Sequence, residues 1–250
     1  MLLNKNFFLK LTSFAVVILF WEYAGRINYS SALPSFTETM SAMFDMVIDG
    51  SLGAAFAKTL YPLAIGLLIS IFLGVALGMF MGLKEAGEWL FAPIFIVAQA
   101  APLAALIPVL TFAYGIGITA KIFTVCIMAM PVIVLNTLGA VRNTPGSLIE
   151  MAKSFQATKF QVVMNIILPA ASPLIFVGLR LGCASGFIGI ILAELLITPT
   201  GIGDIISYNQ SVAEYGKMYA AILSIIVCSV LFIEMLEKTE KLMFSPEKRA

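Results

Sequence analysis

The chain has 250 residues, of which 60% are hydrophobic and 12% charged, and its formal net charge is +1. A soluble domain carries about 25% charged residues, so this composition excludes an ordinary water-soluble protein. Most of the chain is expected to lie in a lipid bilayer or in a helical bundle within one. We expect no nucleic-acid partner.

Six apolar runs of about 20 residues predict six membrane-spanning helices, because a backbone in lipid must satisfy its own hydrogen bonds. The N-terminal run has no convincing small-residue cleavage site and is expected to remain as the first helix. The predicted fold is an all-α integral membrane protein with one domain over residues 1–250. The predicted spans cover about 7–25, 60–83, 89–113, 119–141, 169–197 and 216–236.

The distribution of basic residues predicts the orientation of the chain in the membrane. With the N-terminus in the cytoplasm, ten lysines and arginines face the cytoplasm and four face outward, as the positive-inside rule requires. Both termini, the loop 142–168 and the tail 237–250 are then cytoplasmic. The cytoplasmic set is Lys5, Lys10, Lys84, Arg142, Lys153, Lys159, Lys238, Lys241, Lys248 and Arg249, and the external set is Arg26, Lys58, Lys121 and Lys217.

A short external helix is predicted at 34–49, between the first two spans. Ser35 and Glu38 have the spacing of a capping box, and Gly50 ends the helix. Apolar residues then repeat at helical spacing and predict a stripe that packs on the bundle or docks a partner. The stripe consists of Phe36, Met40, Met43, Phe44 and Val47.

Glycines at four-residue spacing occur in the second and fifth spans, and prolines interrupt the third and fourth. Small residues let helices approach closely in lipid, and packing within one subunit is favoured here over a subunit interface. Prolines kink a helix, so the third span is expected to be bent rather than straight. The glycines are Gly74, Gly78, Gly82, Gly178, Gly182 and Gly186, and the prolines are Pro93, Pro102, Pro108 and Pro131.

Several chemistries are not supported by this sequence. Cys126, Cys183 and Cys228 all fall inside spans, which argues against a disulfide framework, and without histidine a metal site is not expected. No phosphate-binding GxxxxGK[ST] motif occurs, so we expect no ATPase activity in this chain. No nucleophile–base pair is apparent, and the chain is not predicted to be an enzyme.

The loop 142–168 is predicted to form a helix, a turn and a second helix. Ser147 and Glu150 have capping-box spacing, as do Thr158 and Gln161. The turn is expected at about Gln156-Ala157, and Pro169 is expected to open the fifth span. A glycine at position 156 would allow a left-handed turn, so glutamine there predicts a right-handed turn or a shifted hinge. Glu150 could serve only as a cap, or as a cap and a docking residue.

The same loop resembles the EAA signature of permease subunits of ATP-driven importers. Glu150, Ala152, Ile166, Leu168 and Pro169 fall in its register, whereas Met151 and Gln156 replace an alanine and a glycine. The resemblance implies the type I importer permease fold, with a coupling helix between helices 4 and 5 that docks on the ATPase. By carry-over, the coupling residues are Glu150, Met151, Ala152, Phe155, Gln156, Leu168 and Pro169.

Other stretches between about 33 and 205 resemble the nitrate/sulfonate/taurine branch of these permeases. They include Leu33-Pro34-Ser35, Pro102-x-x-Ala105-x-Ile107-Pro108, Gly115-Ile116-Gly117, Asn136-Thr137-x-Gly139, Ala193-Glu194-Leu195-Leu196 and Gly201-Ile202-Gly203. Gln99-Ala100-Ala101 stands where this branch usually has a basic residue before the proline.

The resemblance implies a subunit of the bacterial inner membrane that imports a small anionic solute. It would work as a homodimer with two ATPase subunits, which bind ATP and Mg, and an external solute-binding protein, surrounded by membrane lipid. An importer of a vitamin precursor or aromatic carboxylate is an alternative. An ion-coupled secondary transporter is another, although such proteins usually show paired repeats.

Charged residues inside a membrane are costly and usually face a cavity or a partner. Arg180 and Glu194 lie in the fifth span, about 21 Å apart along the helix, too far to pair with each other. They either face the transport pathway or form separate ion pairs, and the sequence leaves both alternatives open. Gln99, Asn136 and Thr137 are the other polar candidates for the pathway.

Overall fold

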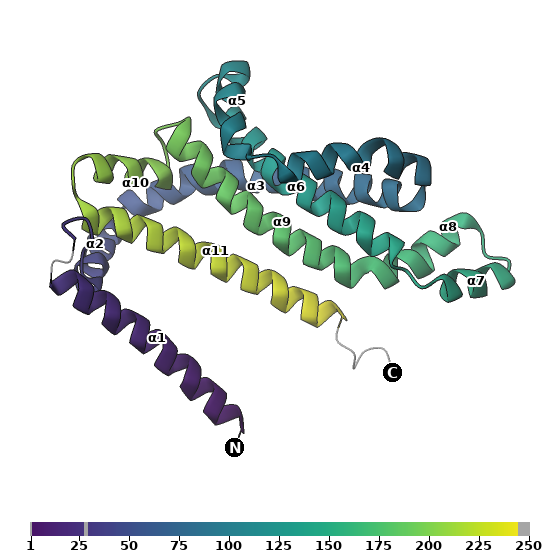
Figure 1. Ribbon diagram of the computed structural model, residues 1–250, viewed down its shortest axis with the longest axis horizontal. Helices are drawn as coiled ribbons and strands as arrows, with labels where there is room; N and C mark the ends of the chain where they lie inside the picture. The colour runs from purple at the N-terminus through teal and green to yellow at the C-terminus, as the bar shows by residue number, and fades with distance from the viewer. Residues whose placement is uncertain (1, 28–29, 245–250) are drawn as a thin grey trace. The chain divides into compact units, whose positions relative to one another are not determined.

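The computed structural model describes residues 2–27 and 30–244, and every regular element in them is a helix. Contacts divide the chain into two compact units, one of Met1–Lys58 with Pro199–Val227 and one of Thr59–Thr198 with Cys228–Ala250. Each unit is described by itself. The elements are α1 (Leu2–Arg26), α2 (Phe36–Ile48), α3 (Ser51–Leu83), α4 (Glu85–Ala100), η1 (Leu103–Leu106), α5 (Ile107–Tyr114), α6 (Ile118–Arg142), α7 (Gly146–Ser154), α8 (Lys159–Val162), η2 (Val163–Ile167), α9 (Leu168–Leu196), α10 (Ile202–Ser211) and α11 (Tyr215–Phe244) (Figure 1).

In the first unit, α1 is fixed to the start of α2 by an aromatic side chain. The indole Nε1 of Trp21 donates to the Pro34 carbonyl at 3.0 Å, and its ring meets Phe36 edge-on with centroids 5.5 Å apart. The capping box is confirmed, since the Ser35 hydroxyl accepts from the Glu38 backbone and the Glu38 carboxylate accepts from the Ser35 backbone. These contacts fix where α2 begins.

The apolar stripe predicted for α2 is only partly correct. Thr39 and Met46 are the buried residues of this helix, whereas Phe44 and Val47 are 66% and 59% exposed. Phe44 and Val47 follow Met43 and Met46 directly, which turns them about 100° away from the buried face. Near the C-terminal end of α2, the buried residue is therefore Met46 and not the predicted Val47.

Asp49 closes α2 and begins the link to α3. Its carboxylate oxygen Oδ1 accepts from the backbone N–H of Ser51 at 2.8 Å. Hydrogen bonds from the Ser51 side chain and backbone hold the pKa of Asp49 below its ordinary value, and the charge of Lys217 acts in the same direction. The carboxylate thus satisfies one of the free amide donors at the start of α3.

The second unit is built around α6, which lies between α3 and α9 (Figure 1). Its central residues, among them Val125, Ala129 and Ile133, are completely buried. Glycines on both neighbours allow this close approach, because an added Cβ would collide with α6. At Gly78 of α3 such an atom would lie 2.5 Å from the Thr137 Cβ.

The glycines of α3 and α9 contact neighbouring faces of α6, and both sets reach Ile133. Gly74, Gly78 and Gly82 of α3 lie against side chains of the α6 segment from Ile133 to Val141. On α9, Gly178 and Gly182 face α6, whereas the nearest atom to Gly186 belongs to a leucine of α3. These glycines therefore serve packing within the chain itself.

The third predicted span, 89–113, is wrong as a single helix. The chain forms α4, then the short turn η1, then α5. Pro102 follows the end of α4, and Pro108 occupies the first turn of α5, where its missing N–H costs no hydrogen bond. The prolines therefore break this segment into two helices where a kink was expected.

Four described helical stretches are long and apolar enough to cross a membrane, where the sequence predicts six spans. They are Ser51–Leu83, Ile118–Arg142, Lys159–Leu196 and Tyr215–Leu242. The first predicted span coincides with α1, but the side chains of residues 1–7 and 10–11 lie outside the described part. In the predicted tail 237–250, α11 continues to Phe244, and residues 245–250 lie outside the described residues.

Replacing Gly78 with alanine should destabilise the second unit. The new methyl would meet the Thr137 side chain and the Val134 carbonyl, and overpacking of this kind costs about 1–3 kcal/mol. Gly139→Ala is the matched control, since no atom lies within 4 Å of an added Cβ there. Thermal unfolding in detergent should show a lower Tm for Gly78→Ala and an unchanged or higher Tm for Gly139→Ala, and equal values would contradict this packing.

Candidate functional site

The loop between α6 and α9 begins with the nine-residue helix α7. Pro145 is its N-cap and no side-chain cap bond forms, so the predicted capping box between Ser147 and Glu150 is wrong. The helix already starts at Gly146, because proline has a fixed φ that suits a helix start. Ser147 is therefore inside the first turn, and Glu150 is exposed with no capping role.

A left-handed residue ends α7. Gln156 has φ +57°, so the predicted right-handed turn or shifted hinge is wrong. The turn keeps two hydrogen bonds of a Schellman motif, from Ala157 N to the Ala152 carbonyl at 3.0 Å and from Gln156 N to the Lys153 carbonyl at 2.9 Å. These bonds satisfy carbonyls at the helix end and compensate for a conformation that costs a non-glycine residue about 1–2 kcal/mol.

After the turn, one continuous helical stretch runs from α8 through η2 into α9. Thr158 caps α8 in the predicted capping box with Gln161, which is confirmed. The segment η2 is a wide π turn, in which Leu168 N donates to the Val163 carbonyl five residues earlier. Pro169 follows at once, and its ring would clash with a carbonyl in a regular α-helix. The wide turn therefore accommodates the proline within the helix.

The inner side of this loop is anchored to the ends of α6 and α9. Ala152, Val162 and Ile167 are buried in one apolar cluster with Val141 of α6 and Ala171 of α9. Because α7, α8 and η2 each contribute a residue to this cluster, the loop is packed against the rest of the second unit. A force on the loop therefore reaches α6 and α9 through direct packing.

The outer side of the same loop is apolar and exposed. Phe155 and Phe160 are 81% and 73% exposed, Met151 is half exposed, and Glu150 lies beside them on α7. Large apolar side chains gathered on an exposed surface mark a site for interaction with a partner. Of the predicted coupling residues, Ala152 and Leu168 pack inward, whereas Glu150, Met151 and Phe155 face outward.

Gln156→Gly should stabilise the loop. Glycine adopts a positive φ without steric cost, so the change should gain up to about 1 kcal/mol after its own entropy cost. Hydrogen exchange of the amides in residues 150–160 should slow in this variant. Gln156→Ala retains the strained φ and serves as the control, and slower exchange in that variant would show that the strain is not the cause.

A buried ionic cluster joins three helices in the second unit. Lys121 Nζ of α6 lies 2.7 Å from Glu194 Oε1 of α9, and their side chains are 2% and 0% exposed. The Thr59 hydroxyl of α3 also lies 2.9 Å from the carboxylate. A buried charge needs such a partner, because its transfer from water is expensive.

The structure places the other charged residue of α9 in a separate ion pair. Arg180 Nη1 lies 3.2 Å from Glu237 Oε2 of α11, and its side chain is about one-quarter exposed. Each of the two charges has a different partner, and Glu194 is buried within the subunit. The structure thus shows separate ion pairs for the two charges. Of the two, the partly exposed Arg180 is better placed than the buried Glu194 to face a transport pathway.

The remaining polar candidates do not gather at one point. Gln99 is exposed near the end of α4, and the Asn136 amide donates to the Val132 carbonyl of its own helix at 2.8 Å. Thr137 is completely buried against the Gly78 backbone. Thr59 and Lys121 were missing from the predicted candidates, although a lysine in the first turn of an apolar helix was a usable signal.

Lys121→Met should destabilise the second unit by about 3–5 kcal/mol, since it leaves the Glu194 charge buried without its cation. The double variant Lys121→Met/Glu194→Leu should regain most of this loss, because apolar side chains of similar volume replace both charges. Thermal unfolding of the two variants measures the difference. A double variant less stable than Lys121→Met would contradict the pairing.

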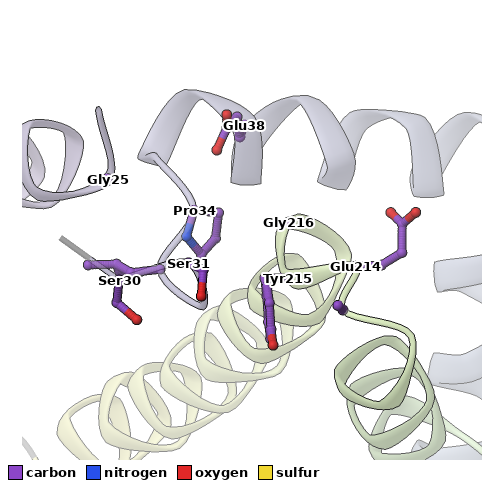
Figure 2. Close-up of a pocket in the computed structure, with 10 residues that line it drawn as sticks. Gly25, Ser30, Ser31, Pro34, Glu38, Glu214, Tyr215 and Gly216 are labelled. Carbon is purple, nitrogen blue, oxygen red and sulfur yellow. The ribbon is translucent and has the colours of Figure 1, made fainter. Parts of the chain in front are cut away.

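The first unit contains a polar cavity of about 390 Å³. Figure 2 shows Ser30, Ser31 and Glu38 across from Glu214 and Tyr215, so the cavity lies between the start of α2 and the start of α11. The Glu38 carboxylate also accepts from the Ser35 backbone at 2.9 Å, and this bond already fixes its position. Gly25, Leu33, Pro34, Ala213 and Gly216 complete the lining.

Comparison with known proteins identifies the class to which this arrangement belongs. Residues 71–238 match the family model described as the binding-protein-dependent transport system inner membrane component, so the chain belongs to that family. It is a permease subunit of an ABC importer. Its relatives place it more narrowly in the nitrate/sulfonate/taurine branch.

Two relatives and one solved structure illustrate these similarities. The chain is 26% identical to the aliphatic sulfonates transport permease protein SsuC of Bacillus subtilis over 90% of this chain and 83% of that protein. It is 27% identical to the nitrate import permease protein NrtB of Synechocystis, over 94% and 88%. The fold resembles a chain of the inward-facing MetNI methionine ABC transporter, with a TM-score of 0.60, 20% identity and coverage of 81% and 98%.

Proposed function

We propose that this chain forms the transport pathway of an ATP-driven importer as a homodimer and is coupled to two ATPase subunits through residues 147–168. The observation that carries this proposal is the two-sided loop. Its inner side is packed on α6 and α9, and its outer side exposes Phe155, Met151 and Glu150. A rigid apolar surface with one carboxylate is suited to a partner groove that offers an apolar pocket and a basic group.

We propose that the chain crosses the membrane six times, with α4 and α5 together in place of the predicted third span, and that both termini and the α7–α8 loop lie in the cytoplasm. ATP and Mg bind to the ATPase partners, and this chain contributes no ATP chemistry. When the ATPases close, they displace α7 and α8, and the movement passes through the buried cluster around Ala152 to the helices of the bundle. Alternating access to a pathway between two permease copies would follow.

We further propose that the imported solute is a small anion, delivered by an external solute-binding protein. Support comes from two relatives whose names assign them aliphatic sulfonates and nitrate, whereas relatives named for riboflavin and formylaminopyrimidine support the vitamin-precursor alternative. Arg180 is a partly exposed cation on α9 and is the residue of this chain that would meet an anion in the pathway. Gln99, Asn136 and Thr137 remain polar candidates for the same route.

Glu150→Arg should detach the ATPase. The change reverses the charge beside the exposed apolar surface and should lower ATPase retention about tenfold or more. The measurement is co-purification of the tagged chain with the ATPase subunit of the same importer, followed by native mass spectrometry. The wild type should give a complex of two permeases and two ATPases.

Asp45→Arg is the matched control, because it makes the same charge change at an exposed position of α2, outside the loop and outside the predicted spans. It should retain the ATPase as the wild type does. Equal retention in Glu150→Arg would reject the docking role of the loop. A wild-type chain that transports solute without ATP would instead favour an ion-coupled secondary transporter.

A further inference from the structure

One face of α4 changes from charged to apolar along its length. Glu85 and Glu88 lie in its first turn, and Trp89, Pro93 and Ile96 follow at spacings that keep them on the same side of the helix. Together with Arg142, the last residue of α6, these side chains line a groove of about 460 Å³. The whole groove lies within the second unit.

The charged end of the groove is partly accessible. Arg142 forms an ion pair with Glu88, and the two side chains are 39% and 35% exposed. Glu85 is exposed, so the end carries two carboxylates and one guanidinium. The neighbouring Lys84 does not add a second cation to the lining, since its Nζ lies over the Phe80 ring, 5.1 Å from the centroid.

The apolar end of the groove is exposed. Trp89 is 84% exposed and Ile96 is 56% exposed. An exposed tryptophan beside charged residues is typical of the boundary between lipid headgroups and hydrocarbon. From Glu85 to Ile96 the helix rises about 16 Å, close to the roughly 15 Å depth of one leaflet's hydrocarbon layer.

We propose that this groove binds one phosphatidylethanolamine molecule. Its ammonium group contacts the Glu85 carboxylate, its phosphate accepts hydrogen bonds from Arg142, and an acyl chain lies along Trp89, Pro93 and Ile96. A guanidinium has five N–H donors, so Arg142 can keep its ion pair with Glu88 and still bind a phosphate.

The charge balance distinguishes this lipid from the other common phospholipids. An anionic headgroup would bring a net negative charge to a site that already holds two carboxylates. A choline headgroup has no N–H to donate to Glu85. The inference requires only that the chain lies in a membrane, and does not depend on the proposed transport or on the solute.

Tryptophan quenching tests the proposal directly, because Trp21 and Trp89 are the two tryptophans of the chain. The full-length permease, with any subunits that co-purify with it, is placed in phosphatidylcholine nanodiscs that contain a small fraction of lipid with brominated acyl chains. Subtracting the signal of Trp89→Phe isolates Trp89. Brominated phosphatidylethanolamine should quench it at about threefold lower mole fraction than brominated phosphatidylglycerol or phosphatidylcholine.

Glu85→Gln should remove this preference, whereas Glu234→Gln, at an exposed position outside the groove, should retain it. A second measurement needs no variant at Glu85: stepwise methylation of the ethanolamine should weaken quenching as N–H donors are lost. Equal quenching by all headgroups would show ordinary surrounding lipid and overturn the proposal. Absence of quenching by any of the lipids would show that protein, such as a second copy of the chain, covers the groove, and it would also overturn the proposal.

Discussion

The close approach of α3 and α9 to α6 is the constraint on which the second unit depends. Helices in lipid gain little from the hydrophobic effect between them, so they rely on dispersion contacts at short distance. Gly78 and Gly182 provide that distance, because a side chain at either position would collide with α6. The buried Lys121–Glu194 pair and the loop cluster both require α6 and α9 to be at this separation.

Local signals in the sequence were sufficient where the chain follows local rules. The capping boxes at Ser35 and Thr158 depend on residues three positions apart, and both form. The same spacing at Ser147 fails, because the preceding proline starts the helix earlier. A capping box is therefore a reliable signal only when no stronger helix start precedes it.

Features that depend on tertiary contacts could not be predicted in this way. Gln156 adopts a left-handed conformation because hydrogen bonds and packing around Ala152 compensate for its local cost. The ion pair of Glu194 with Lys121 joins residues 73 positions apart, and nothing in the local sequence specifies it. The family resemblance located the loop, whereas the structure distinguishes its inward-facing from its outward-facing residues.

The helical stretch Lys159–Leu196 has a mechanical consequence. Its 38 residues span about 57 Å, with the exposed Phe160 near one end and Glu194 near the other. Because the stretch is one continuous helix, a displacement applied at Phe160 would be carried along its length toward Glu194. The wide turn at η2 interrupts the regular hydrogen bonding close to the Phe160 end, so it separates the docking loop from the long regular part of α9.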